Sequence, residues 1–152
     1  MLFEIDVSYC QVVVFAAHLQ EPFSQWTDRH VAQGFAWRPG SASFRTFHDG
    51  PLSVSVVIAS DVLFSADATR VIRVPFEVPC EGRAEIASIA SSQSIVVAPG
   101  TYQVTFEHGV TMNRQWCNLV FCRSDSPGLP AVIRADAELC PEIPLLVLAE
   151  PA

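Results

Sequence analysis

Alternation of apolar and polar residues along most of the chain constrains its fold more than any other feature. Near the start of the chain, Phe3, Ile5, Val7 and Tyr9 are separated by single polar residues. Successive side chains of a β-strand point to opposite faces, so this period of two predicts strands that are buried on one side only. Further runs of this character lie at 10–17, 41–47, 52–59, 70–78, 83–89, 94–97, 102–107, 115–122 and 131–135.

Turn-forming residues separate these runs at short intervals. Adjacent Pro and Gly residues at 39–40, 50–51 and 99–100 place chain reversals between strands. Short strands joined by such turns are typical of sandwiches and barrels, so we expect a mainly β fold, a single-domain antiparallel β-sandwich. Pro75 cannot donate a ladder hydrogen bond, which predicts that 70–78 lies at a sheet edge or carries a bulge.

One short helix is expected at residues 28–33. Thr27 is suited to cap its N-terminus, Asp28 places an acid in the first turn, and Gly34 is suited to end it. A helix of fewer than two turns needs tertiary packing to be stable, and neighbouring aromatic residues can supply it.

The length of the chain predicts one domain. A chain of 152 residues, half of them hydrophobic and with a mean hydropathy of +0.31, can bury a substantial core without stapling. We therefore expect a single β domain over 1–152. Its C-terminal part, 125–152, is acidic, contains several prolines and is expected to be less regular.

The net charge of the chain excludes direct nucleic-acid binding and favours a basic protein partner. All 9 basic residues are arginines, and 16 acidic residues give a net charge of −7. This is the wrong sign for direct nucleic-acid binding, whereas it suits solubility or a basic protein partner. Acids stand where a signal peptide would carry basic residues, and no apolar run reaches the roughly 18 residues of a membrane span. We expect a cytoplasmic protein with no transmembrane segment.

Residues capable of chemistry do not form a recognisable catalytic pattern. The histidines lack zinc-binding spacing and are expected to be partly exposed, and the five cysteines lack C-x-x-C pairs and are expected to be mostly buried free thiols. Neither a nucleophile elbow nor a phosphate-binding glycine loop occurs. We therefore expect no metal, no cofactor and no catalytic residue, and hence a protein that is not an enzyme.

Two groups of residues are candidates for binding. The first is aromatic and favours core packing, with a ligand pocket as the alternative; it comprises Trp26, Phe35, Trp37 and Phe44. The second is acidic and follows Arg134, the last basic residue; it comprises Asp136, Glu138, Glu142 and Glu150. The acidic group is the most partner-like surface of the chain, with a merely solvated face as its alternative.

Several ordered blocks resemble the competence protein J family. The opening blocks are at 7–15, 26–28, 34–37 and 42–44, and the later ones at 73–78, 85–89 and 99–104. Each block alone is unspecific, but their order and spacing over about 7–107 resemble the family. Nothing family-like is apparent after residue 110.

That resemblance implies a small intracellular inhibitor of a DNA-entry nuclease, a metal-dependent and non-specific DNA endonuclease. The inhibitor would bind the nuclease and occlude its DNA site, with no catalysis of its own. Trp26 and Asp28 match a family block and join the four acidic residues as candidate partner-binding positions. An all-arginine basic set is typical of a high-GC genome, which leaves toxin immunity open beside DNA uptake.

Two alternatives stay open at this point. One is a β-sandwich that binds a small ligand or carbohydrate in the aromatic group. The other is a hydrolase whose site has no sequence signature.

Overall fold

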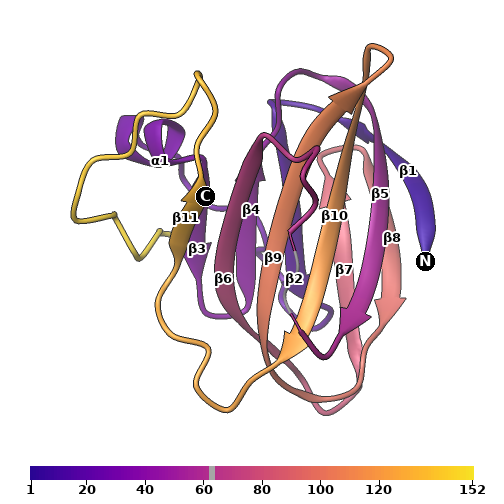
Figure 1. The fold of residues 1–152 in the computed structure, drawn as a ribbon. Helices are drawn as coiled ribbons and strands as arrows, with labels where there is room; N and C mark the ends of the chain where they lie inside the picture. Colours follow the sequence, from indigo (N-terminus) through magenta and orange to yellow (C-terminus); the bar gives the residue numbers. More distant parts are fainter. Residues whose placement is uncertain (62–63) are drawn as a thin grey trace.

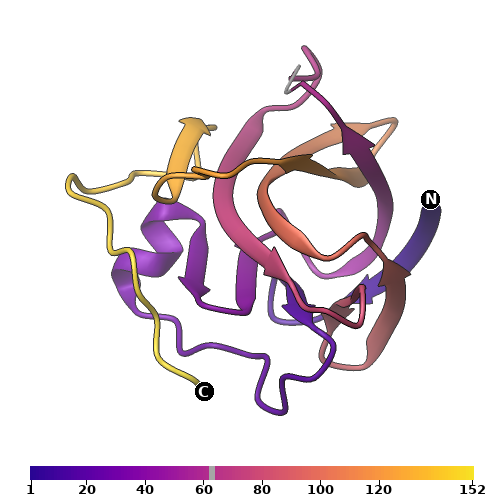
Figure 2. The same cartoon turned by 90° about the horizontal axis from the view of Figure 1, so that it is seen from below.

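The computed structural model describes residues 1–61 and 64–152 and shows two β-sheets packed face to face (Figure 1). The larger sheet has the strand order β1-β5-β10-β9-β6-β11, and the smaller sheet has the order β3-β4-β2-β7-β8. The elements are β1 Leu2–Val7, β2 Gln11–Ala16, α1 Asp28–Gln33, β3 Phe35–Arg38, β4 Ser41–Arg45, β5 Gly50–Ala59, β6 Arg70–Val78, β7 Arg83–Ser88, β8 Ser91–Val96, β9 Gly100–Thr111, β10 Arg114–Arg123 and β11 Ala131–Arg134. Seen from below, the two sheets curve around a common interior (Figure 2).

The predicted fold class is confirmed: the protein is a mainly β sandwich with one short helix. Among the described residues, strand pairs are antiparallel except β5–β10, which is parallel, whereas the sequence predicted antiparallel pairing throughout. The parallel pair arises because the β9–β10 hairpin places β10 between β9 and β5.

Period-two alternation produces the core that joins the two sheets. In β5, Leu52, Val54 and Val56 are buried against the core while Ser53 and Ser55 between them face outward. At the centre, the Phe44 ring of the smaller sheet stacks on Phe106 of the larger one, with ring centroids 4.6 Å apart. These rings belong to the apolar core between the sheets, whose burial is the main stabilising contribution in a domain of this size.

Helix α1 forms at the predicted residues because both of its ends are capped. The Thr27 hydroxyl accepts the backbone N–H of His30, and the His30 ring accepts the N–H of Thr27 at 3.0 Å. Gly34 ends the helix with φ of 86°, a left-handed conformation that glycine adopts without steric cost. Within the described residues, no helix is long and apolar enough to cross a membrane.

Strand β3 was not expected from the sequence, and the environment of Pro75 differs in part from the prediction. β11 pairs with β6 from Val71 to Arg73, so β6 is not the outermost strand along its whole length. Beyond that contact the described strands leave β6 unpaired on this side, and Pro75 lies there with its carbonyl accepting Trp37 Nε1–H at 2.8 Å. Pro75 therefore occupies a local edge, as its missing N–H requires.

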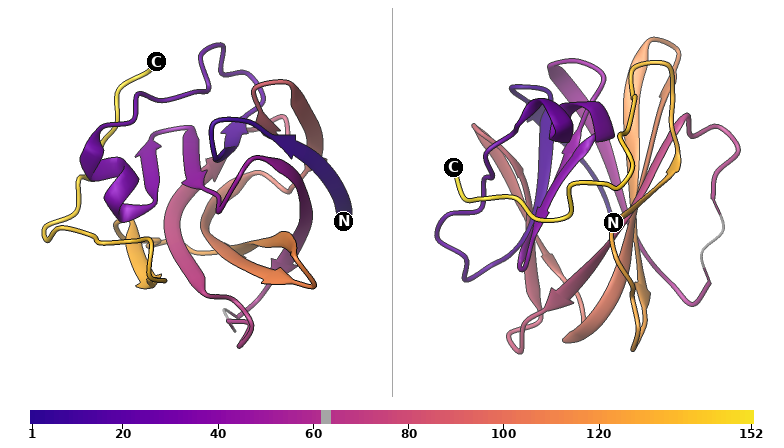
Figure 3. Two further views of the ribbon diagram at one scale, coloured as in Figure 1. Left: turned by 90° about the horizontal axis from the view of Figure 1, so that it is seen from above. Right: turned by 90° about the vertical axis from the view of Figure 1, so that its left-hand side faces the viewer.

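After β11 the chain runs irregularly along α1 and the outer edge of β3 (Figure 3, right). Backbone hydrogen bonds join Cys140 to Ala32 and Ala149 to Trp37. The Gln33 side chain bonds both the carbonyl and the N–H of Leu146 at 2.9 and 3.0 Å. This segment therefore protects the free edge of the smaller sheet in place of a further strand.

Candidate functional site

Three chain connections lie at one end of the sandwich, which we call the loop end. They are the β1–β2 turn at 8–10, the β4–β5 loop at 46–49 and the β9–β10 turn at 112–113 (Figure 3, left, looks down on them). The Cys10 N–H donates to Asp49 Oδ1 at 2.7 Å, and the Cys10 carbonyl accepts the Thr46 N–H at 2.9 Å. Gln115 Nε2 donates to the His48 carbonyl at 2.9 Å. The middle loop is thus tied to the β1–β2 turn and to β10.

Both turns of the loop end hold ordinary side chains in a conformation that they rarely adopt. The φ angles are 56° at Tyr9, 50° at Cys10, 52° at Met112 and 62° at Asn113. Positive φ at both central residues is the geometry of a two-residue type I′ hairpin, which favours Asn and Gly. The strained turns project two large side chains into solvent, because Tyr9 is 79% and Met112 91% exposed.

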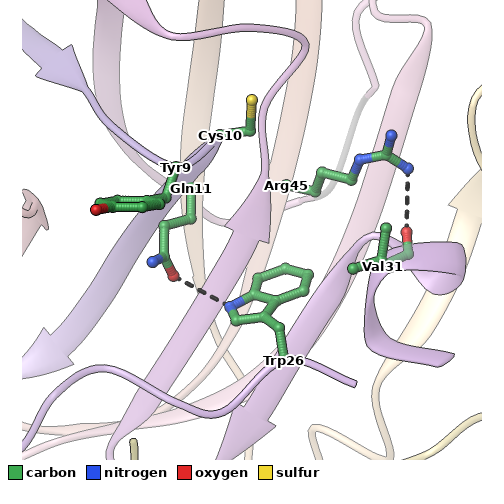
Figure 4. A pocket seen from close by; sticks show the side chains of 6 residues that line it. All are labelled: Tyr9, Cys10, Gln11, Trp26, Val31 and Arg45. Atoms are coloured by element: carbon green, nitrogen blue, oxygen red, sulfur yellow. Dashed lines mark hydrogen bonds between the residues drawn. The ribbon is translucent and has the colours of Figure 1, made fainter. Parts of the chain in front are cut away.

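A shallow pocket of about 340 Å³ opens beside Tyr9 (Figure 4). Its lining consists of Tyr9, Cys10, Gln11, Trp26, Val31 and Arg45. The Trp26 indole N–H donates to Gln11 Oε1 at 3.1 Å, which fixes the ring, and Arg45 Nη1 donates to the Val31 carbonyl at 3.1 Å. Burial, and then the neighbouring Asp49 carboxylate, raise the pKa of the Cys10 thiol, so it stays protonated at neutral pH and is a poor nucleophile.

A buried ion pair lies beneath the loop end. The Arg70 side chain is fully buried and donates to both oxygens of Asp136, from Nε at 2.8 Å and from Nη2 at 3.0 Å. Its Nη2 also contacts Glu138 at 3.2 Å, and its Nη1 donates to the Arg45 carbonyl at 2.6 Å. A charge taken out of water requires such partners.

Stacked rings continue this network. The Arg70 guanidinium lies 4.6 Å from the centre of the Phe47 ring, and Phe47 stacks on His108 with ring centroids 3.9 Å apart. Burial, and then the charge of Arg70, lower the pKa of His108 to about 3. His108 is therefore neutral at physiological pH, which suits its place between a buried cation and the aromatic core.

The predicted acidic residues occupy different environments. Asp136 and Glu138 converge on Arg70, while Glu142 forms an exposed ion pair with Arg29 at 3.5 Å. Glu150 has an exposed side chain, and its carbonyl accepts the Gln25 N–H. The structure therefore brings two of the four together and engages three of them in ion pairs within the chain.

The predicted aromatic group is divided between the core and the surface. Phe35 and Phe44 are fully buried, and Trp37 packs against the same core. Trp26 is separate, because it lines the pocket beside Tyr9. Asp28 is exposed at the start of α1, one residue after the cap.

Some expectations about individual residues are wrong. Cys117 and Cys122 are buried, but Cys80 and Cys140 are exposed, and His30 and His108 are buried rather than partly exposed. Across the described ranges, no group of three or more His, Cys, Asp or Glu side chains could hold a metal ion.

Sequence reasoning missed the two residues that the loop end exposes most, Tyr9 and Met112. Met112 begins the two-residue gap between β9 and β10. Tyr9 lies in the three-residue gap at 8–10, although its alternation with Phe3, Ile5 and Val7 predicted a half-buried strand position. Neither gap carries the Asn-Gly or Asp-Gly pair by which such hairpins are usually recognised.

Comparison with known proteins identifies the family. The family model of competence protein J (ComJ) matches residues 4–122, which is longer than the region expected from the sequence and includes β10. Among solved structures, Bacillus subtilis ComJ, described as an inhibitor of the DNA-degrading activity of NucA, superposes with a TM-score of 0.73 at 23% identity, covering 82% of this chain and 96% of that one.

A second solved structure, described as crocagin biosynthetic gene J, has a TM-score of 0.51 and 14% identity and covers 78% of this chain and 94% of its own. No curated protein sequence matches. The family match spans well over half of the sequence and agrees with the resemblance of the individual blocks. The chain belongs to the competence protein J family.

Proposed function

We propose that this protein inhibits a non-specific DNA endonuclease by binding it and covering its DNA site, in the cytoplasm and without catalysis of its own. The observation that carries the proposal is family membership over residues 4–122, together with a fold shared with a B. subtilis protein described as a nuclease inhibitor. Neither a cofactor nor direct contact with nucleic acid is required by this mechanism.

Electrostatics support the same conclusion. A nuclease groove must attract phosphates, and a chain with a net charge of −7 is drawn toward such a groove. Of the residues predicted to contact the partner, Asp28 and Glu150 have exposed side chains, and Trp26 lines the surface pocket. Glu142 is 70% exposed but shares its charge with Arg29.

The test is a titration of DNA cleavage by the nuclease encoded nearest to this protein's gene, with metal held in constant excess. We expect cleavage to be lost and the loss to saturate at a fixed molar ratio. The association rate should fall by about tenfold or more from low to high salt, because charges at the rim of an interface act chiefly on association. Undiminished cleavage, with no complex on a sizing column, would contradict the proposal.

Small-ligand binding is the second candidate, and the pocket beside Trp26 is the observation that favours it. Its volume of about 340 Å³ is at the lower end for a ligand site. A thermal-shift screen with sugars and small metabolites tests this candidate, since a ligand at about 100 times its Kd adds roughly 2.7 kcal/mol of stability. Stabilisation that is lost in Trp26→Ala would support it.

A further inference from the structure

We infer that the loop end is the surface that docks into the cationic, phosphate-binding groove of the nuclease, with Tyr9 and Met112 as its anchors. This inference rests on the proposed function, because the partner it names is the nuclease. It assigns the contact to a different part of the molecule from the acidic C-terminal segment.

The loop end combines backbone strain with exposed side chains. Tyr9 and Met112 each have positive φ, a conformation that costs a non-glycine residue of order 1 kcal/mol or more. Burial of the side chain does not offset that cost, because 79% of Tyr9 and 91% of Met112 is exposed. Asn or Gly would form the same turns with less strain. Tyrosine and methionine instead give the turns large apolar surfaces of the kind enriched at protein interfaces.

The loop end is also preorganised for binding. The β4–β5 loop is held to the β1–β2 turn by the hydrogen bonds of Cys10 with Thr46 and Asp49, and to β10 by Gln115. From below, the buried Arg70 side chain donates to the carbonyl of Arg45, where β4 ends. A surface fixed before association loses less conformational entropy when it binds.

The charges near the β1–β2 turn indicate the kind of partner. Asp6 in β1 and Asp49 in the β4–β5 loop are both exposed, and Asp49 accepts the N–H of Cys10, the residue after Tyr9. Among the described residues, Arg45 is the one cation that lines the pocket. It donates to the carbonyls of Val31 and Glu138 and lies 3.7 Å from the Glu138 carboxylate. Acidic groups beside exposed aromatic rings suit a basic partner surface.

The pocket gives the loop end a binding site for a basic side chain of the nuclease. It lies between the Tyr9 turn and Trp26, whose indole is fixed by Gln11. An arginine or lysine side chain from the groove wall would lie against the indole, with its charge toward Asp49. The same basic side chains bind DNA phosphates, so occupation of the pocket would directly remove DNA contacts.

The decisive experiment compares three variants by nuclease binding and by stability. Tyr9→Asn and Met112→Asn remove the anchors but keep a residue that tolerates positive φ, so they should fold with unchanged or higher stability. Val96→Ser is the matched control: Val96 is 82% exposed, and it pairs with Arg83 at the opposite end of β7 from Ser88, which contacts the β1–β2 turn.

We expect Tyr9→Asn to weaken nuclease binding by at least about 30-fold, as loss of a central interface residue does, and Met112→Asn by roughly fivefold or more. Val96→Ser should bind like the unchanged protein. If the unchanged protein binds and Tyr9→Asn binds equally well, the loop end is not the interface, while the proposed function stands.

If the unchanged protein does not bind the nuclease at all, the proposed function fails, and the inference fails with it. Sizing chromatography with light scattering tests whether the loop end binds a second copy of this chain instead of the nuclease. A dimer of this chain that dissociates in Tyr9→Asn would mean that the loop end binds a second copy, which overturns the assignment to the nuclease. A monomer in both proteins supports it.

Discussion

Replacing Asp136 with asparagine isolates the buried charge of Arg70. The substitution preserves the shape of the side chain but removes the carboxylate that accepts Nε–H and Nη2–H at 2.8 and 3.0 Å. Arg70 is fully buried and would keep Glu138 as its one anionic partner among the described residues, and the Glu138 side chain is 48% exposed and therefore partly screened by water. Removing one partner of a buried ion pair leaves an uncompensated charge and costs about 3–5 kcal/mol.

For a chain of this length, about 1 kcal/mol corresponds to roughly 2–4 °C in Tm, so Asp136→Asn should lower Tm by about 6–20 °C. Urea unfolding at pH 7, followed by far-UV circular dichroism, measures the same loss as a lower midpoint with an unchanged slope. Glu138→Gln is the matched control. Because its contact is half exposed, it should cost no more than about 1 kcal/mol.

If Asp136→Asn is as stable as Glu138→Gln, Asp136 is not the carboxylate that compensates the buried charge of Arg70. The pair of variants also separates two roles for Asp136. A carboxylate that contacts the nuclease would weaken binding on substitution while stability stayed constant. A carboxylate that fixes Arg70 changes stability first, and binding only through the loop end that Arg70 supports.

Two further predictions concern the core and the helix end. The lowered pKa of His108, about 3, means that below pH 6.5 the unfolded chain binds a proton that the folded chain does not. The contribution of neutral His108 to the free energy of unfolding should therefore be fully present above pH 6.5 and fall by up to about 1.4 kcal/mol per pH unit toward pH 3. In urea titrations, His108→Phe should reduce this loss of stability at acid pH. Equal slopes of stability against pH in both proteins would rule out a contribution from His108. Gly34→Ala combines a φ of 86° with a Cβ only 2.9 Å from Leu139 Cδ2. Gly34→Ala should lower the free energy of unfolding by more than about 1 kcal/mol. Gly128→Ala is the control, because Gly128 also has positive φ but a Cβ there would meet nothing within 4 Å, so its loss of stability should be smaller. Equal losses would show that packing against Leu139 is immaterial.

Local patterns in the sequence predict the local elements of this fold. Alternation at Phe3, Ile5 and Val7 marks a strand because burial of one face is a local requirement, and Thr27 with Gly34 marks a helix because caps satisfy local backbone groups. β3 cannot be predicted in this way, because its four residues are too few to show a period. The parallel β5–β10 pair cannot be predicted from local patterns either, because strand order depends on contacts between residues that are distant in sequence.

The candidate site was harder to predict for the same physical reason. An arginine at the start of an alternating run is expected in solvent, and only a carboxylate 66 residues away makes its burial at position 70 possible. Trp26 was predicted as a candidate partner-binding residue, but its separation from Phe35 and Phe44 depends on the path of the chain over the smaller sheet. Sequence shows which residues are unusual, whereas the fold decides which of them share a surface.

The distribution of charge links the ion pairs to the proposed inhibition. Every ion pair within the described residues includes an acid of the C-terminal segment: Asp136, Glu138 or Glu142. Those three acids pair with three of the 9 arginines, so the net charge of −7 resides in the other thirteen of the 16 acids against six arginines. The segment that looks most acidic in the sequence is therefore the part whose charge is best compensated in the fold. Attraction toward a basic groove must come chiefly from the body of the sandwich, where Asp6 and Asp49 border the Tyr9 turn.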